Sequence, residues 1–195
     1  MTLPSFSFSI CVLCGVSSGP DPSYPRTVGE LGEILGRRGH QLVYGAGGIG
    51  LMGMLARGAV STQGDVAGVI PHFLRSREIG DDLPPQTVVL TDDLVERKRN
   101  MIERSDAYIA LPGGYGTLDE VLEVASMAAL GLPVGPLVLV DVANDWASLF
   151  AMVDDILARG FVRRTDLFHL VSSPLEAVEL VERLLDSSGT AVGTR

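Results

Sequence analysis

The stretch 107-AYIALPGGYGTLDEVLEVA-125 shows most clearly the order of apolar run, turn and helical pattern that is found along the chain. An apolar run ends at Pro112, glycines follow at Gly113, Gly114 and Gly116, and apolar residues then recur at helical spacing. A strand, a turn and a helix in this order are the unit of parallel α/β sheets. Glycine lets backbone N–H groups approach an anion, and a helix start adds unpaired donors. The turn therefore predicts a phosphate-binding site.

A carboxylate just beyond this turn has two interpretations. Thr117 and Glu120 have the spacing of a capping box with Thr117 as the N-cap, and this structural role alone would explain both residues. The run of glycines beside them favours a functional role. Glu123 follows one turn later on the same helix face. Two carboxylates beside a phosphate-binding turn suggest chemistry on the sugar of a sugar phosphate.

The same alternation of apolar runs and helical patterns extends over the chain. The apolar runs are continuous, as expected for strands whose two faces are both covered by helices. This pattern predicts an α/β fold with a doubly wound, mostly parallel sheet of about seven strands. We expect strands at Ser7–Leu13, Gln41–Tyr44, Val66–Ile70, Thr87–Leu90, Ala107–Leu111, Leu137–Val140 and Phe168–Val171.

Residues 1–186 are predicted to form one domain, because no linker or repeat interrupts the pattern. The last helix is expected to begin with Ser173 as N-cap and Pro174 in its first position. The polar residues 187–195 are expected to form a disordered tail.

The net charge of −9 argues against nonspecific binding to nucleic acid or to an anionic membrane. The apolar start is read as a first strand, and we expect a cytoplasmic protein. Cys11 and Cys14 have C-x-x-C spacing, but residues three apart on a strand point to opposite faces. Both are therefore interpreted as core residues, with no metal site or redox pair.

Two further loops follow predicted strands, and both are rich in glycine or serine. Ser17 and Ser18 follow the first strand, and Gly45, Gly47 and Gly48 follow the second. In open α/β sheets, ligands bind at the carboxyl ends of the strands, so both loops are candidate phosphate contacts. The second loop also matches the G-x-G-x-x-G dinucleotide fingerprint. The acidic residue that should follow about 20 positions later is absent, which disfavours NAD(P).

Cationic side chains lie near the same predicted edge. Arg97 and Lys98 come near the start of the helix that follows the fourth strand, and Arg75 and Arg77 follow the third strand. In an acidic protein, this clustering predicts the place where an anionic substrate is held.

With these motifs assembled, the sequence resembles the LONELY GUY family of cytokinin riboside 5′-monophosphate phosphoribohydrolases. The resemblance rests on PGGYGTLDE against the family's P-G-G-x-G-T-x-x-E and on VERKRNM against E-R-K-x-x-M. It implies a Rossmann-like fold and a homodimer with active sites near the interface. It implies hydrolysis of a nucleoside 5′-monophosphate to free base and ribose 5-phosphate, without cofactor or metal. By position, Glu120 and Arg97 resemble the catalytic pair, and the glycine turn with Thr117 resembles the phosphate loop.

The family's older description as lysine decarboxylases is disfavoured. Pyridoxal phosphate needs a Schiff-base lysine, and Lys98 is the single lysine of the chain. Met127 and Ala129 stand where the family commonly has Trp and Gln, so the preferred base is open between isopentenyladenine, adenine and others. Two rivals from other classes stay open: a binding protein like the molybdenum-cofactor carriers, and an NAD(P)-dependent oxidoreductase.

Overall fold

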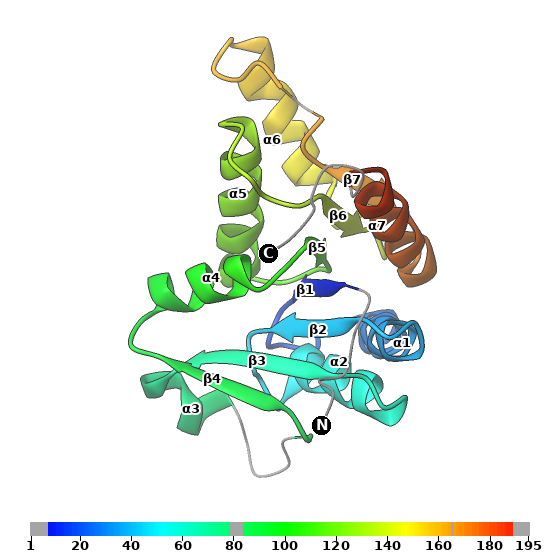
Figure 1. Ribbon diagram of the computed structural model, residues 1–195. Helices are drawn as coiled ribbons and strands as arrows, with labels where there is room; N and C mark the ends of the chain where they lie inside the picture. Colours follow the sequence, from blue (N-terminus) through cyan, green and yellow to red (C-terminus); the bar gives the residue numbers. More distant parts are fainter. Residues whose placement is uncertain (1–7, 79–83, 165, 189–195) are drawn as a thin grey trace.

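The computed structural model describes residues 8–78, 84–164 and 166–188. It contains one seven-stranded sheet in the order β4-β3-β2-β1-β5-β6-β7, in which every neighbouring pair is parallel (Figure 1). The prediction of a mostly parallel, doubly wound sheet is confirmed. The strands are β1 (Ser9–Leu13), β2 (Gln41–Tyr44), β3 (Val66–Pro71), β4 (Thr87–Thr91), β5 (Ala107–Ala110), β6 (Leu137–Val140) and β7 (His169–Val171).

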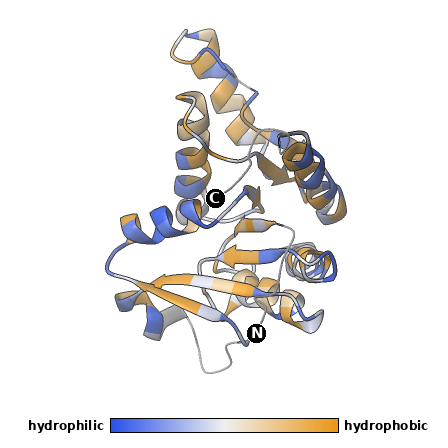
Figure 2. Ribbon diagram, in the orientation of Figure 1, coloured by the Kyte–Doolittle hydropathy of each residue, from blue (hydrophilic) through white to orange (hydrophobic). Residues whose placement is uncertain are grey.

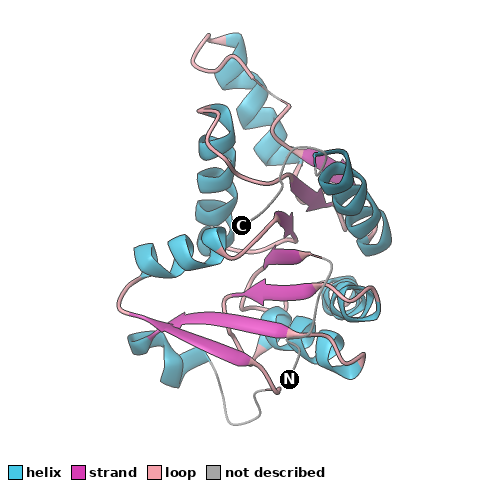
Figure 3. Cartoon of the chain, viewed as in Figure 1, coloured by secondary structure: helices cyan, strands magenta, loops and turns pink. Residues whose placement is uncertain are grey.

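A helix follows each strand along the chain, so strands and helices alternate as expected (Figure 3). Buried side chains of α1, α2 and α7 pack on one face of the sheet, and those of α4, α5 and α6 pack on the other. The helices are α1 (Ser23–Arg37), α2 (Gly50–Ser61), α3 (His72–Glu78), α4 (Leu94–Glu103), α5 (Tyr115–Ala129), α6 (Ala147–Ala158) and α7 (Pro174–Ser188).

The central strand β1 shows why continuous apolar runs are needed. Ile10, Val12 and Cys14 pack with the helices of one face, and Cys11 and Leu13 pack with those of the other. Successive strand residues alternate between faces, so both sets must be apolar. The central strands are correspondingly hydrophobic in Figure 2. Both cysteines are buried and free, on opposite faces, which confirms their interpretation as core residues.

Helix α7 begins as predicted. The backbone N–H of Glu176 donates to Ser173 Oγ at 3.3 Å, which makes Ser173 the N-cap residue before Pro174. The Glu176 carboxylate accepts in turn from the backbone N–H of Ser172, one residue before the N-cap, at 3.0 Å. The helix continues through Ser188, two residues into the predicted tail, and residues 189–195 lie outside the described part of the chain.

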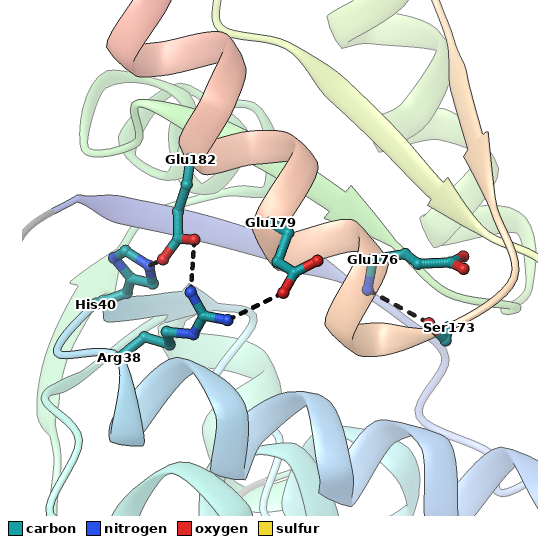
Figure 4. A network of polar contacts seen from close by, with 6 residues as sticks. All are labelled: Arg38, His40, Ser173, Glu176, Glu179 and Glu182. Carbon is teal, nitrogen blue, oxygen red and sulfur yellow. Dashed lines mark hydrogen bonds and ion pairs between the residues drawn. The ribbon is translucent and has the colours of Figure 1, made fainter.

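A polar network ties α7 to the start of β2 (Figure 4). Arg38 forms ion pairs with Glu182 at 2.9 Å and Glu179 at 3.3 Å. The buried His40 places Nε2 2.9 Å from the second oxygen of Glu182. Because these contacts join positions about 140 residues apart in the sequence, they fix the last helix on the sheet.

The strand order creates a crevice beside β1. The chain moves outward from β1 through β2 and β3 to β4, then returns to place β5 on the other side of β1. Loops that leave two such neighbouring strands diverge, and ligands of open α/β sheets bind at this switch point. Within the described ranges, no helix combines the length and the apolar character that crossing a membrane requires.

Candidate active site

A cavity of about 630 Å³ opens at this switch point, between the loops that follow β1 and β5. Its size is typical of sites for small organic ligands. Its lining includes half of the residues predicted from the sequence as site residues, drawn from three separate segments: Ser17, Arg97, Gly113, Gly114, Gly116, Thr117 and Glu120.

Close backbone contacts bring the glycine-rich loops together. The N–H of Gly15 donates to the carbonyl of Pro112 at 3.3 Å, and a Cβ on Gly113 would lie 2.8 Å from the Gly15 nitrogen. Gly50 has a φ of +56°, and a Cβ there would collide with the carbonyl oxygen of Val16. The loops after β1, β2 and β5 therefore converge, as predicted, because glycines let their backbones touch.

The capping-box interpretation of Thr117 and Glu120 is wrong. Helix α5 begins at Tyr115 with Gly114 as its N-cap, so Thr117 lies inside the first turn and Glu120 in the second. Thr117 is buried, and its hydroxyl lies directly beneath Gly113. The first N–H groups of a helix have no intrahelical acceptor and carry partial positive charge. This helix start, which lines the cavity, is thus suited to an anion.

Arg97 is held in place by the ends of two strands. Its Nε donates to the carbonyl of Val69 and its Nη2 to the carbonyl of Gly45, both at 3.2 Å. These bonds fix the guanidinium and leave Nη1 without a recorded partner in the described residues. A Cβ on Gly45 would collide with Nη2.

The predicted glycines of the second loop therefore have a supporting role. Gly45, Gly47 and Gly48 do not line the cavity. Gly45 makes room for Arg97, Gly47 packs on Met52, and the carbonyl of Gly48 accepts from Arg57 at 3.1 Å.

Glu120 is a partly buried carboxylic acid that faces the cavity. Burial raises its pKa from 4.5 to about 7, the nearby Arg97 guanidinium opposes that rise, and Asp119 adds to it. The effect of Arg97 has the sign expected for an opposite charge, but burial outweighs it. Near neutral pH, Glu120 is divided between its two protonation states, as suits a group that assists catalysis.

Three other predicted residues lie outside the cavity, and the side chain of a fourth cannot be placed. Lys98 and Glu123 are paired with each other behind Glu120, at 2.7 Å. Ser18 is exposed in the loop after β1 and is not part of the lining. Arg77 belongs to α3, but its side chain lies outside the described part of the structure.

Sequence reasoning missed one polar wall of the cavity. Tyr24 donates its hydroxyl to Asp145 at 2.6 Å, and both residues line the cavity beside Gly19. This bond raises the pKa of Tyr24 to about 12. Asp145 lies in the loop that follows β6, and this loop contains no glycine. Its position at the same sheet edge was the available signal.

The fold and the cavity define an α/β protein of Rossmann-like fold, with a small-molecule site at its topological switch point and a glycine-rich helix start facing that site. The chain belongs to the family described as possible lysine decarboxylase, which matches residues 52–184, and within it to the LONELY GUY phosphoribohydrolases. The state of Lys98 does not fit the Schiff-base role that a pyridoxal phosphate-dependent decarboxylase requires. Its pKa is raised, chiefly by the hydrogen bond to Glu123, whereas a Schiff-base lysine must be deprotonated.

Similar proteins agree with this membership. The chain is 42% identical over 177 residues to cytokinin riboside 5′-monophosphate phosphoribohydrolase LOG1 of Arabidopsis thaliana, covering 91% of this chain and 82% of that protein. It is 42% identical to a probable enzyme of the same name, LOGL9, from Oryza sativa subsp. japonica, covering 90% and 76%.

Solved structures share the fold at lower identity. The molybdenum cofactor binding protein from Rippkaea orientalis superposes with a TM-score of 0.70 at 21% identity, covering 93% of this chain and 99% of that one. The Moco carrier protein from Chlamydomonas reinhardtii gives 0.67 at 20% identity, covering 92% and 98%. At this identity the likeness concerns the fold alone.

Proposed function

We propose that the chain hydrolyses the N-glycosidic bond of a nucleoside 5′-monophosphate, either a cytokinin riboside 5′-monophosphate or AMP. The products are the free base and ribose 5-phosphate. One observation carries this proposal: Glu120, Arg97 and the glycine-rich start of α5 line a single cavity at the switch point.

The chemistry assigns a task to each part. Cleavage of an N-glycosidic bond builds oxocarbenium-like positive charge on the ribose. Ionised Glu120 stabilises that charge or orients the attacking water. The N–H groups at the start of α5 bind the phosphate. Nη1 of Arg97 is available for the phosphate or the sugar hydroxyls. Because Arg97 is fixed by two carbonyl groups, it needs little reorganisation on binding.

A binding protein like the molybdenum-cofactor carriers is the alternative. It is supported by the shared fold at about one-fifth identity, whereas the relatives at 42% identity are named as enzymes. Glu120 also favours catalysis, because a carboxyl group with a pKa of about 7 inside the cavity suits an acid–base role near neutral pH.

The phosphate is expected to contribute to turnover as well as to affinity. Its binding orients the ribose against Glu120, so adenosine should show a kcat/KM about 10³-fold below that of AMP, with kcat itself reduced. The measurement is chromatographic detection of free base from AMP, isopentenyladenosine 5′-monophosphate, CMP and GMP, with adenosine in parallel. Equal turnover of adenosine and AMP would contradict this role. Absence of base from every nucleotide would favour the binding-protein alternative.

We further propose that the active form is a homodimer that uses the exposed face of α5. Leu118, Leu122 and, on α6, Met152 are exposed and line an apolar cavity of about 390 Å³ beside the active site. Gly113 and Asp145 line both cavities, so a second copy seated there would adjoin the substrate. A cytoplasmic location fits the two free cysteines, because thiols are kept reduced in the cytosol.

Leu122→Glu is expected to convert the dimer to a monomer, because it places a charge in the centre of this apolar face. Light scattering coupled to size-exclusion chromatography should give twice the chain mass for the wild type and the single mass for the variant. Leu175→Glu is the matched control. Leu175 is similarly exposed, at 44% against 41% for Leu122, but lies on α7 across the sheet. Dissociation by both variants, or by neither, would argue against this interface.

A further inference from the structure

A second, much smaller cavity lies behind Glu120, separate from the substrate cavity. It is lined by Lys98 and Glu123 together with apolar side chains of β1, α4 and β5, and Glu120 is the one residue that it shares with the substrate cavity. Glu120 thus separates the substrate from this charged group.

Lys98 is fully engaged within this group. Its Nζ lies 2.7 Å from Glu123 Oε2 and 3.0 Å from Asp119 Oδ2, and its side chain is 19% exposed. An ammonium group held by two carboxylates on α5 is fixed in direction. It is not part of the lining of the substrate cavity, so it acts on Glu120 through its charge.

The charged groups that face Glu120 are balanced. Arg97 and Lys98 on α4 favour its ionised form, while Asp119 and Glu123 on α5 disfavour it. The thiols of Cys11, on β1, and Cys14, just after it, are buried with raised pKa values and are therefore neutral. Of the four charged neighbours, Arg97 alone lines the substrate cavity.

We propose that Lys98, held by Asp119 and Glu123, is a positioning residue that sets how much of Glu120 is ionised and does not contact the substrate. This inference rests on the proposed hydrolysis. It assigns Lys98 and Glu123 an electrostatic role in place of the substrate contacts expected from the sequence. Opposite charges on the two residues should then have opposite effects on the reaction.

The test is the pH profile of kcat/KM for AMP. The wild type should lose activity as the pH falls through about 7, where Glu120 takes up its proton. Lys98→Met removes a positive charge, so protonation becomes easier and this limb should move to higher pH. Glu123→Gln removes a negative charge, so the limb should move to lower pH. Each shift should be about 0.5–1 pH unit, because the side chains of Lys98 and Glu123 are partly exposed to solvent, which weakens their effect on Glu120.

Two further variants separate charge from structure. Lys98→Arg keeps the charge and should restore the limb towards that of the wild type. Arg99→Met removes a positive charge from the exposed side of the same helix and should leave the limb in place. Melting temperatures of all variants report any loss of folding. If Lys98→Met does not fold, the shift of Glu123→Gln still decides the question.

The outcomes are distinguishable. Base release by the wild type with opposite shifts in the two variants would support the inference. A higher KM in both variants with an unmoved limb would overturn it and make the two residues substrate ligands. Absence of base release from the wild type with any nucleotide would instead refute the proposed hydrolysis, on which the inference depends.

Discussion

Glu120→Gln is expected to lower kcat for base release about 10³–10⁴-fold while leaving nucleotide binding nearly intact. The amide has almost the shape of the carboxylate but carries no charge for the oxocarbenium-like transition state. The phosphate contacts at the start of α5 are unchanged, so the dissociation constant for AMP should stay within a few-fold. Single-turnover base release and calorimetric titration measure the two quantities.

Stability separates this effect from misfolding. Burial raises the pKa of Glu120 to about 7, so the folded protein bears a cost for the ionised form that grows as the pH rises from the unfolded value towards 7. Gln has no such cost, and the variant should melt no lower than the wild type at pH 8. Glu103→Gln, at an exposed position of α4, is the control and should keep full activity. A Glu120→Gln enzyme with normal kcat would remove Glu120 from the mechanism.

Gly32→Ala is expected to destabilise the fold by about 2–3 kcal/mol, because α1 and α2 meet backbone to backbone at this position. A Cβ on Gly32 would collide with the carbonyl oxygen of Leu55 and lie 2.9 Å from the nitrogen of Ala59, both in α2. Neither atom belongs to a side chain that can move aside. Urea denaturation should show a lower midpoint with an unchanged slope.

Gly29→Ala in the same helix provides the matched control. A Cβ there meets nothing within 4 Å. The substitution should stabilise the protein by about 0.5–1 kcal/mol, because alanine favours helix over glycine. The two changes are chemically identical, so the difference in sign isolates the contact between the helices. Equal destabilisation by both would show that α1 tolerates alanine poorly everywhere.

The sheet could be predicted from the sequence because each strand is an uninterrupted apolar run between turns. All seven predicted strands are found, with boundaries that agree closely. A strand that is buried on both faces appears in the sequence as a continuous apolar run, which is easy to recognise. The prediction failed where one spacing fits two structures. Thr117 and Glu120 are three positions apart. This spacing occurs in a capping box, and it also occurs between residues in adjoining turns of one helix. The glycines before them, which start the helix at Tyr115, decided the matter.

The part of the site that could be predicted from the sequence is the part that lies in or beside glycine-rich loops. The phosphate turn, Arg97 and Glu120 do share one cavity, because the carboxyl ends of parallel strands meet at one edge. The wall formed by Tyr24 and Asp145 could not be found from spacing, since its two halves are 121 positions apart. The role of Gly45 was also hidden. A glycine that makes room for an arginine looks the same in sequence as one that makes room for phosphate.

The pairing of Lys98 also affects how the protein can be labelled. The chain has a single lysine, so amine-reactive dyes, biotin esters and crosslinkers find one side-chain amine, and it is bound to Asp119 and Glu123. Acylation would cancel its charge and disconnect it from both carboxylates behind Glu120. With the role proposed for Lys98, such a label should move the acid limb of the pH profile to higher pH and lower activity near neutral pH. Immobilisation or fluorescent labelling of this enzyme is better directed to an introduced cysteine, because the two native thiols are buried.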